Sequence, residues 1–331
     1  MKRNQVVMVT GASAGLGRAI AHGFAQLGAK IGLIARNRDA LESCREEVEQ
    51  LGGEALVLPL DVSDAAPIEH AASRLEEAFG PIDVWVNNAM ASVFAPVKQM
   101  TAEEFKRVTE VTYLGYVYGT QAALRRMLPR DRGTIVQVGS ALAAGSLPLQ
   151  SAYCGAKHAI QGFTDSLRSE LDHDNSNVQL TVVQMPAMNT ARFTWTKNRL
   201  PYKPQPVPPI FQPEAAAKVV VHAAGVRRPK PEYWVGSPTV EPIVGQMFAP
   251  GRLDRDLGEA TYQAQRTDVP DDPDRQNNLW DYVPGEHSAH GPFDQRSCFF
   301  SPQVFLDQHH RWFAAGGAAL VTAIVVGIKK R

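Results

Sequence analysis

The stretch SAYCGAKHAI, residues 151–160, contains a tyrosine and a lysine four positions apart. On a helix, residues i and i+4 lie on the same face about one turn apart, so Tyr153 and Lys157 can meet. The pair is either a proton-transfer site in which the lysine charge tunes the tyrosine, or two amphipathic side chains on a surface helix. The spacing alone does not separate these interpretations, so the elements that position the pair must decide.

A glycine-rich loop follows the first apolar run of the chain, in VVMVTGASAGLG, and supplies Gly11, Gly15 and Gly17. Glycines at a strand-to-helix turn let the backbone approach a pyrophosphate, which binds the free N–H groups at the helix N-terminus. An ordinary glycine-rich turn is the alternative, and the spacing G-x-x-x-G-x-G differs from the G-x-G-x-x-G of many dinucleotide folds. The place of the loop, directly after a first strand, favours a dinucleotide site.

The end of the second apolar run indicates which dinucleotide binds. An acidic residue at that place holds the ribose hydroxyls of NAD, whereas an arginine accommodates the 2′-phosphate of NADP. The sequence IGLIARNR has Arg36 there, with Arg38 nearby, and no carboxylate before Asp39. We therefore predict NADP(H) as the cofactor.

Short apolar runs alternate with longer helical patterns over residues 5–185. Several runs have no polar interruption, which is typical of strands buried on both faces of a parallel sheet. The repeat predicts an α/β fold, a Rossmann-like doubly wound parallel sheet in three layers. The expected strands are residues 5–10, 30–36, 54–62, 82–89, 134–140 and 177–185, and an amphipathic helix is expected with a buried stripe of Leu41, Cys44, Val48 and Leu51.

Composition excludes some classes of protein. Lys and Arg together number 34, as do Asp and Glu, so no net charge favours binding to nucleic acid. Three widely spaced cysteines indicate reduced thiols and not a disulfide framework. The apolar run at the N-terminus is too short for a secretory signal.

Taken together, these motifs resemble the short-chain dehydrogenase/reductase family, in its compact single-domain branch, over roughly residues 5–240. TGASAGLG matches the family's cofactor loop, with Ser13 and Leu16 beside the glycines. LDVSD places Asp61 where the family binds the adenine ring, and NNA at residues 87–89 places Asn88 in the motif after the fourth strand. Tyr153 and Lys157 match the Y-x-x-x-K signature, and Ser140 lies at the family's usual separation upstream.

The resemblance implies an oxidoreductase that interconverts an alcohol and a ketone or aldehyde by hydride transfer. Tyr153 would be the acid/base, with its usual pKa of about 10 lowered by the Lys157 cation. Ser140 would orient the reacting oxygen, and Lys157 would also hold the nicotinamide ribose. Pro186 and Thr190 fall where the family binds the nicotinamide, and a homo-oligomer is the expected assembly.

The chain departs from the family pattern at three places. Thr112 replaces the asparagine that supports a proton-relay water, Met90 replaces the glycine of NNAG, and Ala187 replaces the glycine after Pro186. The first two favour an alternative, a non-catalytic NADP(H)-binding sensor or scaffold, which the intact serine, tyrosine and lysine set opposes. The extended branch of the superfamily lacks support because its G-x-x-G-x-x-G spacing is absent. His287 and His290 form an H-x-x-H, which we interpret as loop histidines, so no metal site is expected.

Residues 1–240 form the predicted dehydrogenase domain, and the rest of the chain is expected to consist of an extension and a hydrophobic segment. Residues 201–213 hold six prolines and are expected to lack regular structure. Substrate specificity is expected to come from residues 187–215, which include this segment. Residues 241–311 are an expected extension, in which Trp280, Tyr282 and Phe293 suggest a loop packed on the domain. Residues 312–328 carry no charge and predict a C-terminal transmembrane helix, or else a helix docked on protein. With the domain in the cytoplasm, this segment would make the protein membrane-associated and suit a lipophilic substrate.

Overall fold

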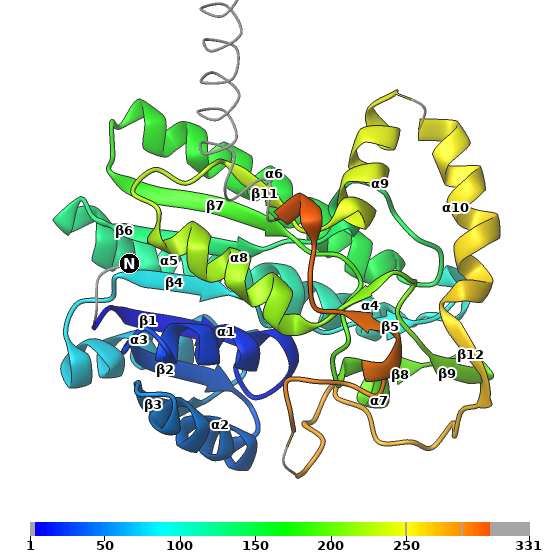
Figure 1. The fold of residues 1–331 in the computed structure, drawn as a ribbon, viewed down its shortest axis with the longest axis horizontal. Coiled ribbons are helices and arrows are strands. Elements are labelled where there is room, and N and C mark those ends of the chain that lie inside the picture. The colour runs from blue at the N-terminus through cyan, green and yellow to red at the C-terminus, as the bar shows by residue number, and fades with distance from the viewer. Residues whose placement is uncertain (1–3, 249, 286, 305–331) are drawn as a thin grey trace, which may run out of the picture.

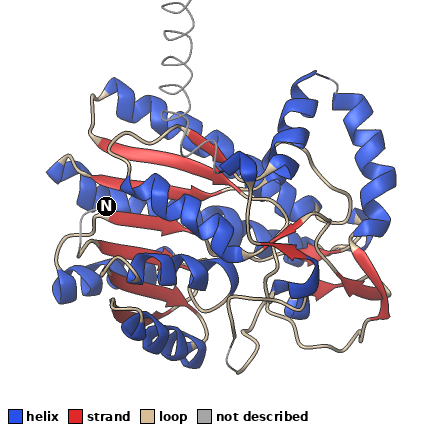
Figure 2. Ribbon diagram, viewed as in Figure 1, coloured by secondary structure: helices blue, strands red, loops and turns tan. Residues whose placement is uncertain are grey.

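The computed structural model describes residues 4–248, 250–285 and 287–304. A seven-stranded sheet forms its centre, in the order β11-β7-β6-β4-β1-β2-β3, and every neighbouring pair of strands is parallel. Helices cover both faces of this sheet (Figures 1 and 2). The predicted three-layer, doubly wound α/β fold is therefore confirmed.

The strands of this sheet coincide with the apolar runs of the sequence. Their bounds are β1 Val6–Thr10, β2 Lys30–Ala35, β3 Glu54–Pro59, β4 Val84–Asn87, β6 Gly133–Val138, β7 Val178–Gln184 and β11 Glu232–Trp234. The covering helices are α1 Gly15–Ala25, α2 Arg38–Gln50, α3 Ala65–Phe79, α4 Ala102–Thr109, α5 Gly115–Met127, α6 Ser151–His173 and α8 Pro213–Gly225. A short π-helical turn over Glu110–Leu114 joins α4 to α5.

Alternation along each strand separates two apolar cores. In β1, Val7 and Val9 pack in the core that contains residues of α1, α2 and α8, whereas Val6 and Met8 pack against residues of α3, α5 and α6. Burial on both faces explains why the strands read as continuous apolar runs. The stripe predicted for α2 is buried except at Leu51, which lies at the helix C-cap and is 37% exposed.

The proline-rich segment is more regular than its composition predicts. Within it, β9 (Tyr202–Pro204) pairs with β12 (Arg266–Pro270), and β10 (Ile210–Phe211) pairs with β13 (Ser297–Cys298). The expectation of no regular structure was therefore wrong. Prolines are tolerated here because each sheet has two short strands, so few ladder hydrogen bonds are lost.

The remaining elements lie beyond the carboxyl ends of the central strands (Figure 1). They include the helices α7 (Arg192–Trp195), α9 (Ser237–Phe248) and α10 (Pro250–Ala264), and a third small sheet of β5 (Val93–Phe94) with β8 (Lys197–Asn198). The predicted domain boundary at residue 240 falls within α9.

Part of the C-terminal extension packs on the domain as a strap, which we define as residues 277–285 and 287–293. Phe293 and Leu279 are buried in it, whereas Trp280 and Tyr282 are about half exposed. Of the three aromatic residues that were expected to pack this loop on the domain, only Phe293 is therefore buried. No helix among the described residues is long and apolar enough to cross a membrane. The predicted span 312–328 lies outside the described residues.

Candidate active site

A cavity of about 530 Å³ lies at the carboxyl ends of the central strands. In doubly wound sheets, ligands bind at this edge. Every site residue predicted from the sequence lines the cavity: Gly11, Ser13, Gly15, Leu16, Gly17, Arg36, Asp61, Asn88, Ser140, Tyr153, Lys157, Pro186 and Thr190. The fold thus brings together residues that are distributed over nearly 180 positions of the chain.

Tyr153 and Lys157 lie one turn apart on α6, and both are buried. The Lys157 Nζ donates to the carbonyl oxygen of Val138 at 2.7 Å and to the Tyr116 hydroxyl at 3.1 Å. It lies 5.6 Å from the centroid of the Tyr153 ring. The i, i+4 spacing therefore places the lysine charge beside the tyrosine, inside the molecule and not on a surface helix.

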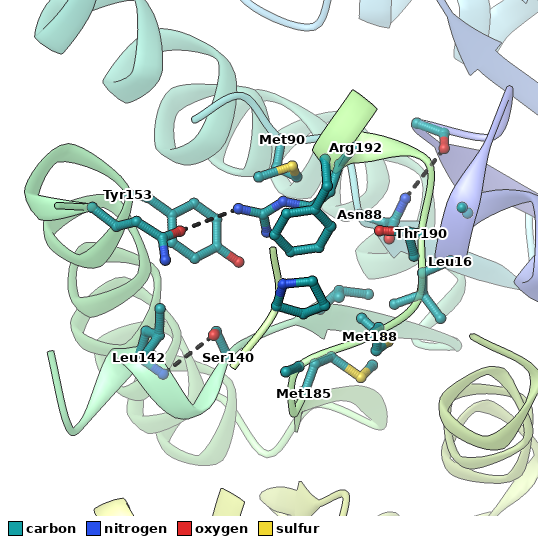
Figure 3. A pocket seen from close by; sticks show the side chains of 18 of the residues that line it. Leu16, Asn88, Met90, Ser140, Leu142, Tyr153, Met185, Met188, Thr190 and Arg192 are labelled. Atoms are coloured by element: carbon teal, nitrogen blue, oxygen red, sulfur yellow. Dashed lines mark hydrogen bonds between the residues drawn. The ribbon is translucent and has the colours of Figure 1, made fainter. Parts of the chain in front are cut away.

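Ser140 follows β6 and faces the same cavity, where its Oγ accepts the N–H of Leu142 at 3.2 Å (Figure 3). Burial raises the pKa of Tyr153, while the Arg192 cation and a hydrogen bond with Ser140 oppose that rise. Burial, with a smaller contribution from Arg192, lowers the pKa of Lys157 to about 7. The environment therefore shifts both groups toward their neutral forms before any ligand charge is added.

The glycine loop has the conformation that a close backbone approach requires. Gly11 and Gly15 have φ of +68° and +56°, and a Cβ on Gly17 would lie 2.0 Å from the Gly11 oxygen. At the start of α1, the N–H groups of Leu16 and Gly17 make no hydrogen bond within the part of the chain that the structure describes. Two free donors at a helix N-terminus fit the pyrophosphate of a dinucleotide.

Asn88, directly after β4, holds the glycine loop in place through hydrogen bonds to Thr10. Its Nδ2 donates to the carbonyl oxygen of Thr10 at 2.9 Å, and its N–H donates to the Thr10 hydroxyl at 2.8 Å. Met90 lines the cavity near Arg192 and Thr190 (Figure 3). A side chain thus occupies the place where the family usually has none.

The strap crosses the other end of the cavity, where the adenosine of a dinucleotide would lie. Arg36 donates to the carbonyl oxygens of Trp280 at 2.7 Å and Asn278 at 2.5 Å, and burial lowers its pKa. Farther along, the N–H of Gly15 donates to the Ser288 oxygen at 3.1 Å. The strap therefore hydrogen-bonds two residues, Arg36 and Gly15, that are themselves predicted to bind the cofactor.

Asp61 has its carboxylate held by Arg107 and by the N–H and hydroxyl of Ser63. Although burial opposes the effect, these hydrogen bonds hold the pKa of Asp61 below its usual range. Arg107 in turn donates to the Leu279 oxygen at 2.9 Å and stacks on Trp280. The strap is thereby tied to the predicted adenine site as well.

Thr112 does not line the cavity. It is fully buried in the π-helical turn, and its hydroxyl donates to the Ala91 oxygen and accepts the Ala91 N–H, both at 2.9 Å. The hydroxyl is therefore committed to the backbone after β4. His287 and His290 bond to Val283 and Glu214, and no metal-binding cluster occurs among the described residues.

Four residues that the sequence analysis did not select complete the site: Tyr116, Gln150, Arg192 and Gln265. Tyr116 contacts Lys157, and Gln150 links Arg192 at 3.2 Å to Gln265 at 2.7 Å. Of these four residues, only Gln150 could have been selected from the sequence, because it lies about one helical turn before Tyr153 and so on the same side of the helix. Gln265 is brought in by α10, which no local pattern connects to the site.

Comparisons with known proteins agree with this geometry. Residues 5–199 match the family described as short chain dehydrogenase. An uncharacterized oxidoreductase, YxnA of Bacillus subtilis, is 32% identical over 86% of this chain and 80% of its own. The mouse dehydrogenase/reductase SDR family member 7B is 36% identical, over 57% of this chain and 59% of its own length.

Solved structures of short-chain oxidoreductases also resemble this chain. A metagenomic short-chain oxidoreductase in complex with NADP superposes with a TM-score of 0.60 at 27% identity, covering 70% of this chain and 96% of that one. An alcohol dehydrogenase from Thermococcus sibiricus, complexed with 5-hydroxy-NADP, gives 0.59 at 26% identity over the same shares. The chain belongs to the short-chain dehydrogenase/reductase family and is an oxidoreductase of that family.

Proposed function

We propose that this oxidoreductase uses NADP(H) to interconvert an alcohol and a ketone or aldehyde, with Tyr153 as the acid/base. The observation that carries the proposal is the convergence of Ser140, Tyr153 and Lys157 with the free N–H groups of the glycine loop on one cavity. A surface pair of amphipathic side chains would not be buried against that loop.

Each residue of the set has a distinct task. Tyr153 gives its proton to the reacting oxygen in the reductive direction and takes it back in the oxidative one. Ser140 orients that oxygen and stabilises the charge that develops on it. Lys157, fixed by Val138 and Tyr116, favours the phenolate of Tyr153 when it is protonated. The bound nicotinamide supplies or accepts the hydride.

Arg36 supports the choice of NADP(H). It lies at the end of β2, lines the cavity and is held by backbone carbonyls of the strap. Among the described residues Arg36 forms no ion pair, although the charges of Asp61 and Asp281 act on its guanidinium, so a 2′-phosphate would not have to displace a bound carboxylate. The two solved relatives described above were complexed with NADP or a hydroxylated NADP.

The test is turnover by the purified full-length protein, with NADPH and a panel of ketones and aldehydes, alongside direct measurement of NADPH binding. Oxidation of NADPH that depends on the carbonyl compound supports the proposal. Tight NADPH binding without turnover of any carbonyl compound, or of alcohols with NADP⁺, would favour the alternative of a non-catalytic sensor.

We further propose that residues 312–328 attach the protein to a membrane, with the catalytic domain in the cytoplasm. The support is the uncharged segment itself, followed by the basic residues KKR. A homo-oligomer also stays a prediction, which light scattering of the purified protein checks.

A further inference from the structure

Arg192 brings a second cation to the reacting end of the cavity. It opens α7, two residues after Thr190, and its guanidinium carbon lies 5.2 Å from the centroid of the Tyr153 ring. Phe193 lies at a similar distance, 5.1 Å, and Phe94 at 6.0 Å. Figure 3 shows Arg192 and Tyr153 side by side in the pocket.

The charge of Arg192 has no counter-charge in the described part of the chain. Its guanidinium donates from Nη2 to the neutral Gln150 Oε1 at 3.2 Å and also hydrogen-bonds the Tyr153 hydroxyl, while its buried Nε has no hydrogen-bond partner. Arg107 and Arg199, by contrast, each pair with a carboxylate. Arg192 is partly buried, and a cation withdrawn from water without a carboxylate partner is costly, which favours a site that receives an anion.

The surroundings of Arg192 strengthen this reading. Lys157, the other cation near Tyr153, bonds only to neutral oxygens. Glu241 lines the cavity from α9 but forms no ion pair with Arg192 among the described residues. The pyrophosphate of a dinucleotide would have its own donors at the start of α1, where Gly15 lies against Thr190. Apart from the phenolate form of Tyr153, which Arg192 contacts, the substrate is the remaining source of an anion for this guanidinium.

Resting on the proposed function, we propose that the substrate carries a carboxylate close to its reacting carbon, and that Arg192 binds this carboxylate. Guanidinium and carboxylate form two parallel hydrogen bonds, which would use the free Nε. The rest of the cavity near α7 is lined by Phe193, Trp195, Pro206 and Leu257, which suits an apolar remainder. The preferred substrates are thus oxo acids and hydroxy acids with an aliphatic chain.

The first experiment compares 2-oxohexanoate and 3-oxohexanoate with their methyl esters as substrates of the full-length protein with NADPH. We expect the acids to be preferred, and Arg192→Gln to raise the KM of the preferred acid by about 10- to 100-fold, the value of a hydrogen bond to a charged group. The ester should be affected far less, and Arg192→Lys should retain part of the preference. The control is Arg45→Gln, an arginine paired with Glu42 and Glu49 on the outer side of α2.

The second experiment needs no turnover. Calorimetry of the NADP⁺-saturated protein should show hexanoate binding more tightly than hexanamide, and Arg192→Gln should abolish the difference. Equal binding of the two, or an equal loss for acid and ester, overturns the proposal, because Arg192 would then act only through Tyr153 or the fold. If no carbonyl compound is turned over while hexanoate still binds through Arg192, the proposed reaction fails and the carboxylate site stands.

Discussion

Two basic residues lie beside the Tyr153 ring, and neither forms an ion pair with a carboxylate in the part of the chain that the structure describes. Lys157 lies on the same helix and is buried, whereas Arg192 is the first residue of α7 and is partly exposed; both line the cavity. Burial works against the charge of every member of this group, so the pKa of Tyr153 is raised and that of Lys157 is lowered. Bound ligand charges therefore decide which protonation state the site adopts.

The shift of Lys157 makes the stability of the cofactor-free protein depend on pH. Its pKa falls from 10.5 to about 7 on folding, so between these values the unfolded chain binds a proton that the folded chain does not. Stability contributed by this site must then rise with pH across that window. We expect the unfolding free energy of the wild type, relative to Lys157→Met, to rise by at most about 1.4 kcal/mol per pH unit. Denaturant titrations near neutral and alkaline pH measure it, and a flat difference would contradict the shift.

Arg36 should set cofactor preference. In Arg36→Asp, a carboxylate would repel the 2′-phosphate of NADPH and accept hydroxyls of the NADH ribose, so NADPH binding should weaken far more than NADH binding. Arg36 also holds the strap, and release of the strap should weaken both cofactors alike. The ratio of the two dissociation constants is therefore the measurement. An unchanged ratio would remove Arg36 from this role.

At the level of elements, the strap runs along the predicted cofactor site, from Arg36 to the backbone of Thr190. Gly291 lies where it passes the backbone after β7, and a Cβ there would meet the Thr190 oxygen at 2.4 Å. Gly291→Ala should push the strap away and raise the Kd of NADPH on the order of tenfold, about 1.4 kcal/mol. Gly162→Ala, at an open position on α6, is the matched control. Equal Kd values for both variants would show that the strap does not retain the cofactor.

The elements differ in how far the sequence predicts them. The central strands were predictable because strands buried on both faces are continuous apolar runs, and the glycine loop and Y-x-x-x-K pair have fixed spacings. The strap was not, because it binds Arg36, Arg107 and Gly15 through backbone carbonyls, which any residue supplies. Arg192 was missed for a related reason, since its place beside Tyr153 depends on where α7 lies and not on local spacing.

At the level of the whole molecule, the proposed membrane attachment rests on residues 312–328. These seventeen positions carry no charge, and a helix of that length spans about 25 Å, slightly less than the hydrocarbon core. We expect the full-length chain in the membrane fraction and a truncation ending at Arg311 in the supernatant. Recovery of both chains in the supernatant without detergent would mean that the segment docks on protein.

Substitution of Tyr153 tests directly whether its hydroxyl exchanges the proton with the substrate. Tyr153→Phe removes the hydroxyl that exchanges the proton and keeps the buried ring that packs beside Lys157 and Arg192. With a carbonyl substrate that the wild type reduces, kcat should fall by about 10²- to 10⁴-fold, the usual contribution of a general acid, while NADPH binds with nearly unchanged affinity. A Tyr153→Phe enzyme that keeps most of its kcat would contradict the assignment of Tyr153 as the acid/base.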